Sequence, residues 1–269
     1  MLIKKNNFKE KLLETYLSDK TICKMAFWKY QALINESETY YLPEYDSYYA
    51  VYNKFLFVYF SPDRKCHVPV EELNALDGIY INAGIVDGIK NNLVGFEPPS
   101  YSWQLHYDKE YKPLMLPDDF CVLEFDCANE EHYKLMAYTQ DGFTVDNVKK
   151  VEAMYKKNSV FDPSLWIFIQ DKKTKEFIGS GISSYDKFVK ETNLDEISIL
   201  PNYQGKGAGR FMMQEIINRS LDRSDAISVG GNVAFYRKCG FYDFAYNAWV
   251  QKPGYSLTAP AIQSNLTYF

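Results

Sequence analysis

Three glycines fall within five residues near the end of the chain, in the stretch ILPNYQGKGAGRFMMQ that runs from Ile199 to Gln214. This stretch stands between a β-like run and an apolar, helix-like run. The first turn of a helix has unpaired N–H groups and the positive end of the helix dipole. Glycines allow the chain to turn tightly and bring those N–H groups against an oxyanion. The pattern therefore predicts a loop that binds a phosphate group.

Two cationic side chains, Lys206 and Arg210, lie in this glycine loop, and their charge favours a pyrophosphate as the ligand. The P-loop pattern G-x-x-x-x-G-K-[ST] is absent. The glycines are spaced G-x-G-x-G, not as the G-x-G-x-x-G of a dinucleotide-binding unit. An ordinary glycine-rich turn remains the alternative. The glycine loop consists of Gln204, Gly205, Lys206, Gly207, Ala208, Gly209 and Arg210.

The composition narrows the class of protein. The 269 residues are 46% hydrophobic and 24% charged, as in a globular chain able to bury a core. The net charge of −5 argues against nucleic acid as the main partner, because binding its phosphates requires a basic surface. No stretch approaches the roughly 20 apolar residues that span a bilayer, and the N-terminus lacks the apolar region of a signal peptide. The five cysteines show no C-x-x-C spacing, so we expect reduced thiols in a cytoplasmic protein.

The order of predicted elements divides the chain near residue 116, where prolines and charges interrupt the pattern. Residues 1–115 predict a smaller α+β domain of unknown role, with an amphipathic helix at 8–18. Residues 117–269 predict an α+β domain in the order strand, two helices, a three-strand meander, a helix, a strand, a helix and a strand. Thr144 is expected to cap the second of these helices. The sequence shows no internal repeat.

The stretch ISILPNYQGKGAG resembles the acetyl-CoA site of the GNAT superfamily, the acetyl-CoA-dependent N-acyltransferases. The family motif Q/R-x-x-G-x-G/A follows a strand and a proline, and it is matched by Gln204, Gly207 and Gly209. A second family element is an Asn, an Ala and an aromatic–Tyr pair before a Gly-Phe. Its counterparts here are Asn232, Ala234, Phe235-Tyr236 and Gly240-Phe241.

The resemblance covers the chain from about Pro117 to the C-terminus and implies a mixed, mostly antiparallel sheet flanked by helices. It also implies acetyl-CoA as the cosubstrate. The backbone of Ile197, Ser198 and Ile199 would pair with the pantetheine arm, like an added strand. The amides of the glycine loop, together with Arg210, would hold the pyrophosphate. Asn232 and Phe235 complete the implied cofactor site.

The family reaction is direct attack of an amine on the thioester. It implies that Tyr236 protonates the departing CoA thiolate and that a backbone N–H near Ile199 polarises the carbonyl. A carboxylate of the preceding strand often takes the amine's proton, and Asp195 and Glu196 are the candidates. Strand alternation places Asp195 on the face of Ile197 and Ile199, which favours it over Glu196 unless a bulge shifts the register. A solvated acid at the strand entrance is an equal alternative for either residue.

Other signals are weaker. The short segment DRSDAISVGGN departs from the family pattern before Asn232, and this can shift the motif around it. Cys66-His67 lacks the further ligands of a metal site, so we predict no metal. Cys239 is expected to be a packing residue.

We predict an N-acetyltransferase for a primary amine on a small molecule or peptide. The alternatives are a CoA-binding regulatory protein or an interaction protein, on the same scaffold but without turnover. The sequence does not distinguish monomer from dimer.

Overall fold

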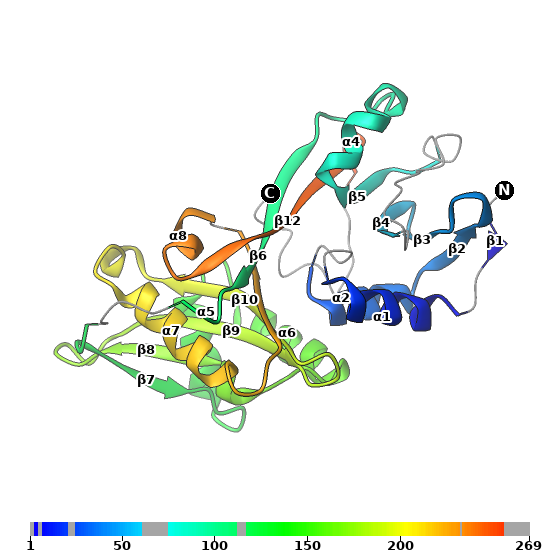
Figure 1. Cartoon of the computed structure of the whole chain (residues 1–269). Coiled ribbons are helices and arrows are strands. Elements are labelled where there is room, and N and C mark those ends of the chain that lie inside the picture. Colours follow the sequence, from blue (N-terminus) through cyan, green and yellow to red (C-terminus); the bar gives the residue numbers. More distant parts are fainter. Residues whose placement is uncertain are drawn as a thin grey trace. The chain divides into compact units, whose positions relative to one another are not determined.

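The computed structural model describes residues 3–4, 7–20, 25–60, 75–111, 117–231 and 233–255. These residues fall into two compact units (Figure 1). The described residues up to Gln104 and those from Asp243 to Tyr255 form the first unit, and those from Leu105 to Tyr242 form the second. Within the described ranges, no helix combines the length and the apolar character needed to cross a bilayer.

The second unit contains a mixed, mostly antiparallel sheet with helices on both faces, as the sequence predicts. Its elements also follow the predicted order along the chain. Its strands are β6 (Ser100–Tyr107), β7 (Phe120–Glu124), β8 (Ile167–Asp171), β9 (Phe177–Asp186), β10 (Glu191–Ile199), β11 (Ala226–Gly230) and the start of β12 (Phe241–Gln251). Its helices are α5 (Glu130–Thr139), α6 (Val145–Lys157), α7 (Ala208–Ser220) and α8 (Val233–Arg237), with short 3-10 helices at Pro163–Leu165 and Pro201–Tyr203.

Neighbouring strands of this unit lie in the order β6-β11-β10-β9-β8-β7. The strands from β7 to β10 pair antiparallel, and β10 pairs parallel with β11. Helix α5 covers one face of the sheet, where Thr139 Oγ1 donates to Ser180 Oγ at 2.6 Å. The next residue of β9, Gly181, faces Met212 and Ile216 of α7. Because side chains alternate along a strand, α7 covers the opposite face.

Helix α6 begins at the residue that the sequence predicts. The Asn147 N–H donates to Thr144 Oγ1 at 3.2 Å, and the Thr144 N–H donates to Asn147 Oδ1 at 2.9 Å. This reciprocal pair is a capping box, which satisfies N–H groups at the helix start. Further along the helix, Val148, Val151 and Tyr155 are buried. Tyr155 therefore lies on the buried face of α6, which packs against the sheet.

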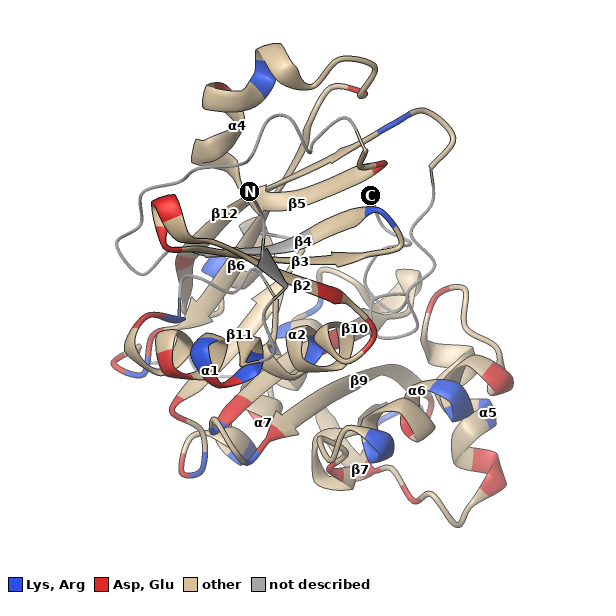
Figure 2. Cartoon of the chain, turned by 90° about the vertical axis from the view of Figure 1, so that its right-hand side faces the viewer, with Lys and Arg blue, Asp and Glu red and all other residues tan. Residues whose placement is uncertain are grey.

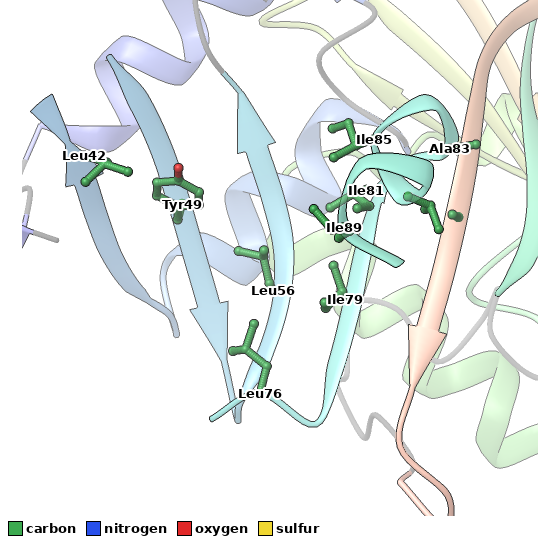
Figure 3. Packing of buried hydrophobic residues seen from close by; sticks show 11 residues of the cluster. Leu42, Tyr49, Leu56, Leu76, Ile79, Ile81, Ala83, Ile85 and Ile89 are labelled. Atoms are coloured by element: carbon green, nitrogen blue, oxygen red, sulfur yellow. The ribbon is translucent and has the colours of Figure 1, made fainter. Parts of the chain in front are cut away.

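The strands of the first unit lie in the order β1-β2-β3-β4-β5-β12-β6. The helix predicted at 8–18 is present. The elements are β1 (Ile3–Lys4), α1 (Phe8–Ser18), α2 (Phe27–Ile34), β2 (Glu38–Leu42), β3 (Ser47–Tyr52), β4 (Phe55–Phe60), β5 (Gly78–Asn82) and α4 (Ala83–Ile89), with 3-10 helices at Pro43–Tyr45 and Lys90–Asn92. Figure 3 shows the apolar cluster that α4 forms with this sheet: Leu42, Tyr49, Leu56, Leu76, Ile79, Ile81, Ala83, Ile85, Val86, Ile89 and Ala248.

Two long strands belong partly to each unit. Strand β6 passes from the first unit to the second between Gln104 and Leu105, and β12 passes back between Tyr242 and Asp243. The division into 1–115 and 117–269 stays a prediction from the sequence pattern. The unit to which a strand belongs depends on the strands with which it pairs, and it does not follow from the strand's position along the chain. The end of β12 pairs antiparallel with β5, from Asn247 opposite Asn82 onward.

The two units repeat one order of elements. Each has a strand, two helices, a three-stranded antiparallel meander, a strand parallel to the last of these, a helix and a long strand. In the second unit α7 stands between the meander and the parallel strand, and the corresponding segment of the first unit lies largely outside the described residues. The sequence shows no internal repeat, and the repeat is found in the topology alone. The sequence conceals the repeat because the glycine loop occurs in the second half alone.

Charged residues of both signs are mixed along the helices. Figure 2 shows acidic and basic residues together on α1, α5 and α6. The helices seen in this view therefore present no single-sign surface of the kind that follows a nucleic-acid backbone.

Candidate active site

The glycine loop leads directly into α7. Gly205 and Gly207 have φ values of 76° and 92°, in the left-handed region that favours glycine. Gly207 occupies the N-cap position of α7 and has no side chain to cap it. The amides of the first turn of α7 are thus presented to the loop without a competing side chain, as an anion site requires. Arg210 lies half-buried in that first turn.

Strand β10, which precedes the glycine loop, is paired over a longer stretch with β9 than with β11. The antiparallel ladder of β10 with β9 continues to Ile199. The parallel ladder with β11 ends earlier, at Leu194 opposite Val229, as far as the described residues of both strands show. Strand β10 therefore diverges from β11 over its last residues, which include the predicted cofactor-binding residues Ile197, Ser198 and Ile199.

The peptide groups of this diverging segment have defined directions. The Leu200 N–H donates to Ile178 O, on the β9 side, at 2.8 Å. Alternate residues of a strand direct their peptide groups to opposite edges, so those of Ile197 and Ile199 point to the open edge. There the side-chain amide of Gln204 donates to Ile199 O at 2.9 Å. Gln204 thus ties the start of the glycine loop to the open edge of β10.

The glycine loop, the open edge and α8 meet at Gly209. A Cβ atom on Gly209 would lie 3.3 Å from Phe235 Cζ and 3.6 Å from Ile199 Cγ1. The small residue therefore allows α7 to begin close to both elements. The structure brings together three of the predicted cofactor residues at this point. Asn232, also predicted to bind the cofactor, lies outside the described residues.

The two candidate acids lie at a β-bulge in β10. Leu194 pairs with Ser183 and Glu196 pairs with Ile182, the next residue of β9. Asp195 is therefore an extra residue between two regular pairs, as in a bulge. The bulge comes directly after the last pair of β10 with β11, so it stands where the two strands begin to diverge.

The bulge changes the face that Asp195 occupies. Its carboxylate accepts a hydrogen bond from Ser184 Oγ at 3.0 Å. Ser184 and Gly181 point to opposite faces of β9, and the side chain of Ile197 lies on the Gly181 face. The prediction that Asp195 shares a face with Ile197 and Ile199 is therefore wrong, because the inserted residue breaks the alternation.

The Asp195 carboxylate accepts hydrogen bonds from three elements. The Tyr155 hydroxyl of α6 and Ser184 Oγ of β9 both donate to Oδ2. Asn193 Nδ2 donates to Oδ1 at 2.6 Å. Burial, together with the adjacent Asp195, raises the pKa of the Tyr155 phenol well above its usual value, so Tyr155 keeps the proton that it donates. We call these four residues the Asp195 cluster.

Tyr236, the predicted proton donor, is nearly buried in α8 with 8% of its surface exposed. Burial raises the pKa of its phenol, and the charge of the neighbouring Glu196 raises it further. Glu196 is itself buried, at 7% exposed. Burial also raises the pKa of the Cys239 thiol to about 11, with Arg210 acting in the opposite sense. Cys239 is thus a buried, protonated thiol, which fits a packing role.

The turn after α8 is held by the chain that follows β6. The Asp108 N–H donates to Gly240 O at 2.9 Å, and the Tyr111 hydroxyl donates to Lys238 O at 3.2 Å. Gly240 has a φ of 93°, and a Cβ there would lie 2.4 Å from the Tyr111 ring. This segment of the chain therefore fixes the end of α8, the helix that carries Tyr236.

Sequence reasoning missed both of these supports. Tyr155 lies in the predicted amphipathic helix without any motif to distinguish it from other core residues. Tyr111 lies before the predicted domain boundary and was assigned to the other half. The Cys66-His67 pair falls outside the described residues. Within the described ranges, no group of His, Cys, Asp and Glu side chains is arranged to hold a metal ion.

Residues 129–241 match the family model described as the acetyltransferase (GNAT) family. The chain contains a GNAT acetyltransferase domain. The match includes the bulge, the glycine loop and α8, and it ends at Phe241. The sequence-based resemblance to this family is thereby confirmed. It supports an acyltransferase that performs acetyl transfer in the general sense. No curated protein matches the chain.

Solved structures resemble the chain over nearly its whole length, not over the GNAT domain alone. A GCN5-related N-acetyltransferase from Sphaerobacter thermophilus is 13% identical with a TM-score of 0.64, covering 96% of this chain and 97% of that one. A GNAT-family acetyltransferase from Colwellia psychrerythraea is 10% identical with a TM-score of 0.62, covering 94% and 100%. A tandem GNAT protein from the clavulanic acid biosynthesis pathway is 8% identical with a TM-score of 0.60, covering 96% and 99%. At these identities the likeness establishes the fold.

Proposed function

We propose that the chain is an acetyl-CoA-dependent N-acetyltransferase that moves an acetyl group to a primary amine of a small molecule or peptide. The observation that carries this proposal is the convergence of three features. The glycine loop at the start of α7, the open edge of β10 and the buried phenol of Tyr236 all belong to one end of the sheet in the second unit.

Acetyl-CoA would bind through its pantetheine arm, whose amides resemble those of a peptide backbone, and through its pyrophosphate. The amides from Gln204 to Arg210 would hold the pyrophosphate at the positive end of α7. The peptide groups of Ile197 and Ile199 would bond the pantetheine amides along the open edge, as an added strand does. Because Gln204 already occupies Ile199 O, the Ile199 N–H is the group left at that residue for the cofactor.

The proposed reaction is a direct transfer. The amine nitrogen attacks the thioester carbon and forms a tetrahedral intermediate. The carbon–sulfur bond then breaks, and the CoA thiolate takes the proton of the Tyr236 hydroxyl. Burial raises the pKa of this phenol, so Tyr236 is protonated at neutral pH and holds the proton that the thiolate would take. The amine loses its own proton to a base during the attack.

Glu196 is the better candidate for that base. Glu196 directly follows the bulged residue of β10, and its charge raises the pKa of the Tyr236 phenol as well as that of Tyr155. Both oxygens of Asp195 accept hydrogen bonds, from Tyr155, Ser184 and Asn193, and these bonds fix its carboxylate within the sheet. We therefore assign Asp195 a positioning role and Glu196 the proton-accepting role, which reverses the preference drawn from strand alternation.

The test is an acceptor screen with the full chain and acetyl-CoA, in which release of the CoA thiol is followed with a thiol reagent. We expect release that depends on one class of amine and that is lost in Glu196→Gln. Binding of acetyl-CoA without release across small amines, aminoglycosides and peptides would favour the CoA-binding regulatory protein. Absence of acetyl-CoA binding would refute the proposal.

A further inference from the structure

We propose that the first unit is a second copy of the acyltransferase fold whose cofactor cleft is filled, so that the chain binds a single acetyl-CoA, in the second unit. The part of this inference that concerns acetyl-CoA rests on the proposed function. The rest follows from the register of the strands, which aligns the two units residue by residue.

The strand registers provide two fixed points. In the second unit, Leu194 is the last residue of β10 paired with β11, and the bulged residue follows it. In the first unit, Leu56 is the last residue of β4 paired with the parallel strand β5. The ladder with β3 then passes from Leu56 to Val58, so Phe57 is the extra residue of a bulge. In both units the bulged residue directly follows the last residue that pairs with the parallel strand. Leu56 therefore corresponds to Leu194.

The same alignment extends into the helices. The partner of Leu56 is Ile79, and the partner of Leu194 is Val229. Counting three residues onward from each partner reaches Asn82 and Asn232, and a helix begins at the next residue in both units. The first unit thus retains the bulge, the diverging strands and the asparagine before the helix.

The groups needed for chemistry are missing from the first unit. The positions of Asp195 and Glu196 are held by Phe57 and Val58. The position of Tyr236 is held by Val86. The segment between β4 and β5, residues 61–77, contains no glycine, so it has no counterpart of the glycine loop. The sequence of the first unit therefore has no glycine between β4 and β5, and it has apolar residues at the positions of the acids and of the proton donor.

The place of Tyr236 is filled by packed apolar side chains in the first unit. Val86 is 3% exposed and belongs to the apolar cluster beneath α4. Its cluster neighbours on α4, Ile85 and Ile89, are also buried, and Figure 3 shows them over Ile81 and Ile79 of β5. At this position α4 thus packs an apolar side chain against the sheet, whereas α8 of the second unit carries a phenol, which is also nearly buried.

This internal comparison separates architecture from function. The first unit forms the bulge with a phenylalanine, so the bulge does not require Asp195 or Glu196. It forms a helix after the asparagine without a tyrosine at the position of Tyr236. The bulge and the helix therefore do not require the polar residues found in the second unit alone, and the proposed acetyl transfer gives these residues a role.

The test uses the full chain and a matched pair of variants, Asn82→Ala and Asn232→Ala. Equilibrium dialysis with labelled acetyl-CoA should give one bound molecule per chain. Asn232→Ala should weaken binding about tenfold or more. Asn82→Ala should leave the affinity unchanged and lower Tm, because the Asn82 side chain caps α4 by accepting from the Gly84 N–H at 2.9 Å. Two bound molecules per chain, or weakened binding in Asn82→Ala, would overturn the inference.

A second measurement does not depend on the cofactor. Val86→Thr places a hydroxyl in the apolar cluster at nearly constant volume, so Tm should fall by several degrees. An unchanged Tm would mean that the cleft of the first unit is open and would overturn the inference. If acetyl-CoA binds nowhere, the proposed function fails, and the result for Val86→Thr alone decides whether the first cleft is filled.

Discussion

Replacement of Tyr155 by phenylalanine separates a positioning role of Asp195 from a catalytic one. Tyr155→Phe keeps the ring, whose centroid lies 5.6 Å from that of Trp166, and removes the hydroxyl that donates to Asp195. A hydrogen bond to a charged group contributes about 1.5–3 kcal/mol. In a chain of this size, 1 kcal/mol shifts Tm by roughly 2–4 °C, so Tm should fall by about 3–12 °C.

The kinetic effect should be small. Ser184 and Asn193 still hold the carboxylate, and the proposed base is Glu196, so kcat should stay within about threefold of the wild type. The assay is thermal unfolding followed by circular dichroism, together with steady-state kinetics by thiol release. If kcat instead fell by about a hundredfold or more, the scale of general acid–base catalysis, with little change in Tm, this assignment of roles would be refuted.

Tyr133→Phe is the matched control. The Tyr133 hydroxyl donates to Glu152 Oε2 at 2.6 Å, also in a buried site and on the neighbouring helix α5. Removing it deletes the same kind of phenol–carboxylate bond away from the bulge. A similar fall in Tm is expected in both variants, so any kinetic difference between them belongs to the Asp195 cluster.

Three further outcomes are expected. Tyr236→Phe should lower kcat by roughly 10²–10⁴-fold with little change in acetyl-CoA affinity, as steady-state kinetics and a binding titration would show; full activity would remove Tyr236 from the mechanism. Gly240→Ala should destabilise the chain, because its Cβ would meet the Tyr111 ring at 2.4 Å in a left-handed backbone, and a Tm equal to the wild type would contradict this packing. Burial raises the pKa of Tyr80 to about 12 and also raises those of Tyr155 and Tyr236. Since these values exceed the unfolded value of about 10, the protonated phenols stabilise the fold below that pH. That stability is lost as pH rises through the raised values. Exposed tyrosines such as Tyr138 ionise in the folded chain, so a second rise in tyrosinate absorbance from the buried phenols should coincide with alkaline unfolding; complete tyrosinate absorbance in a chain that is still folded would contradict this.

The second unit could be predicted well because its signals are local. The glycine loop, the Thr144 cap and the alternating runs of β8 to β10 each lie within a few residues, and they placed the elements in the correct order. The position of Gly207 at the start of α7 followed from the same local pattern.

The remaining features depend on contacts distant in sequence. The bulge at Asp195 is visible only in the pairing of β10 with β9, and it reversed the face expected from alternation. The donors to Asp195 come from α6 and β9, and no spacing in the sequence links them. Strands β6 and β12 join sheets that their positions along the chain do not indicate. The repeat is visible only in strand register and topology. The first unit has other residues at the positions that make the GNAT motifs of the second unit recognisable.

Calorimetric titration with acetyl-CoA tests the central claim, that the glycine loop of α7 holds the cofactor. Three full-length proteins are compared: the wild type, Gly207→Asp and Gly142→Asp. Gly142 has a φ of 71° with no atom near its Cβ position, so its variant matches the added charge and the left-handed backbone away from the loop. Binding is expected in the wild type and Gly142→Asp, and none in Gly207→Asp, whose carboxylate opposes the pyrophosphate. No heat with the wild type at high micromolar acetyl-CoA, or equal affinity in a folded Gly207→Asp, would contradict the account.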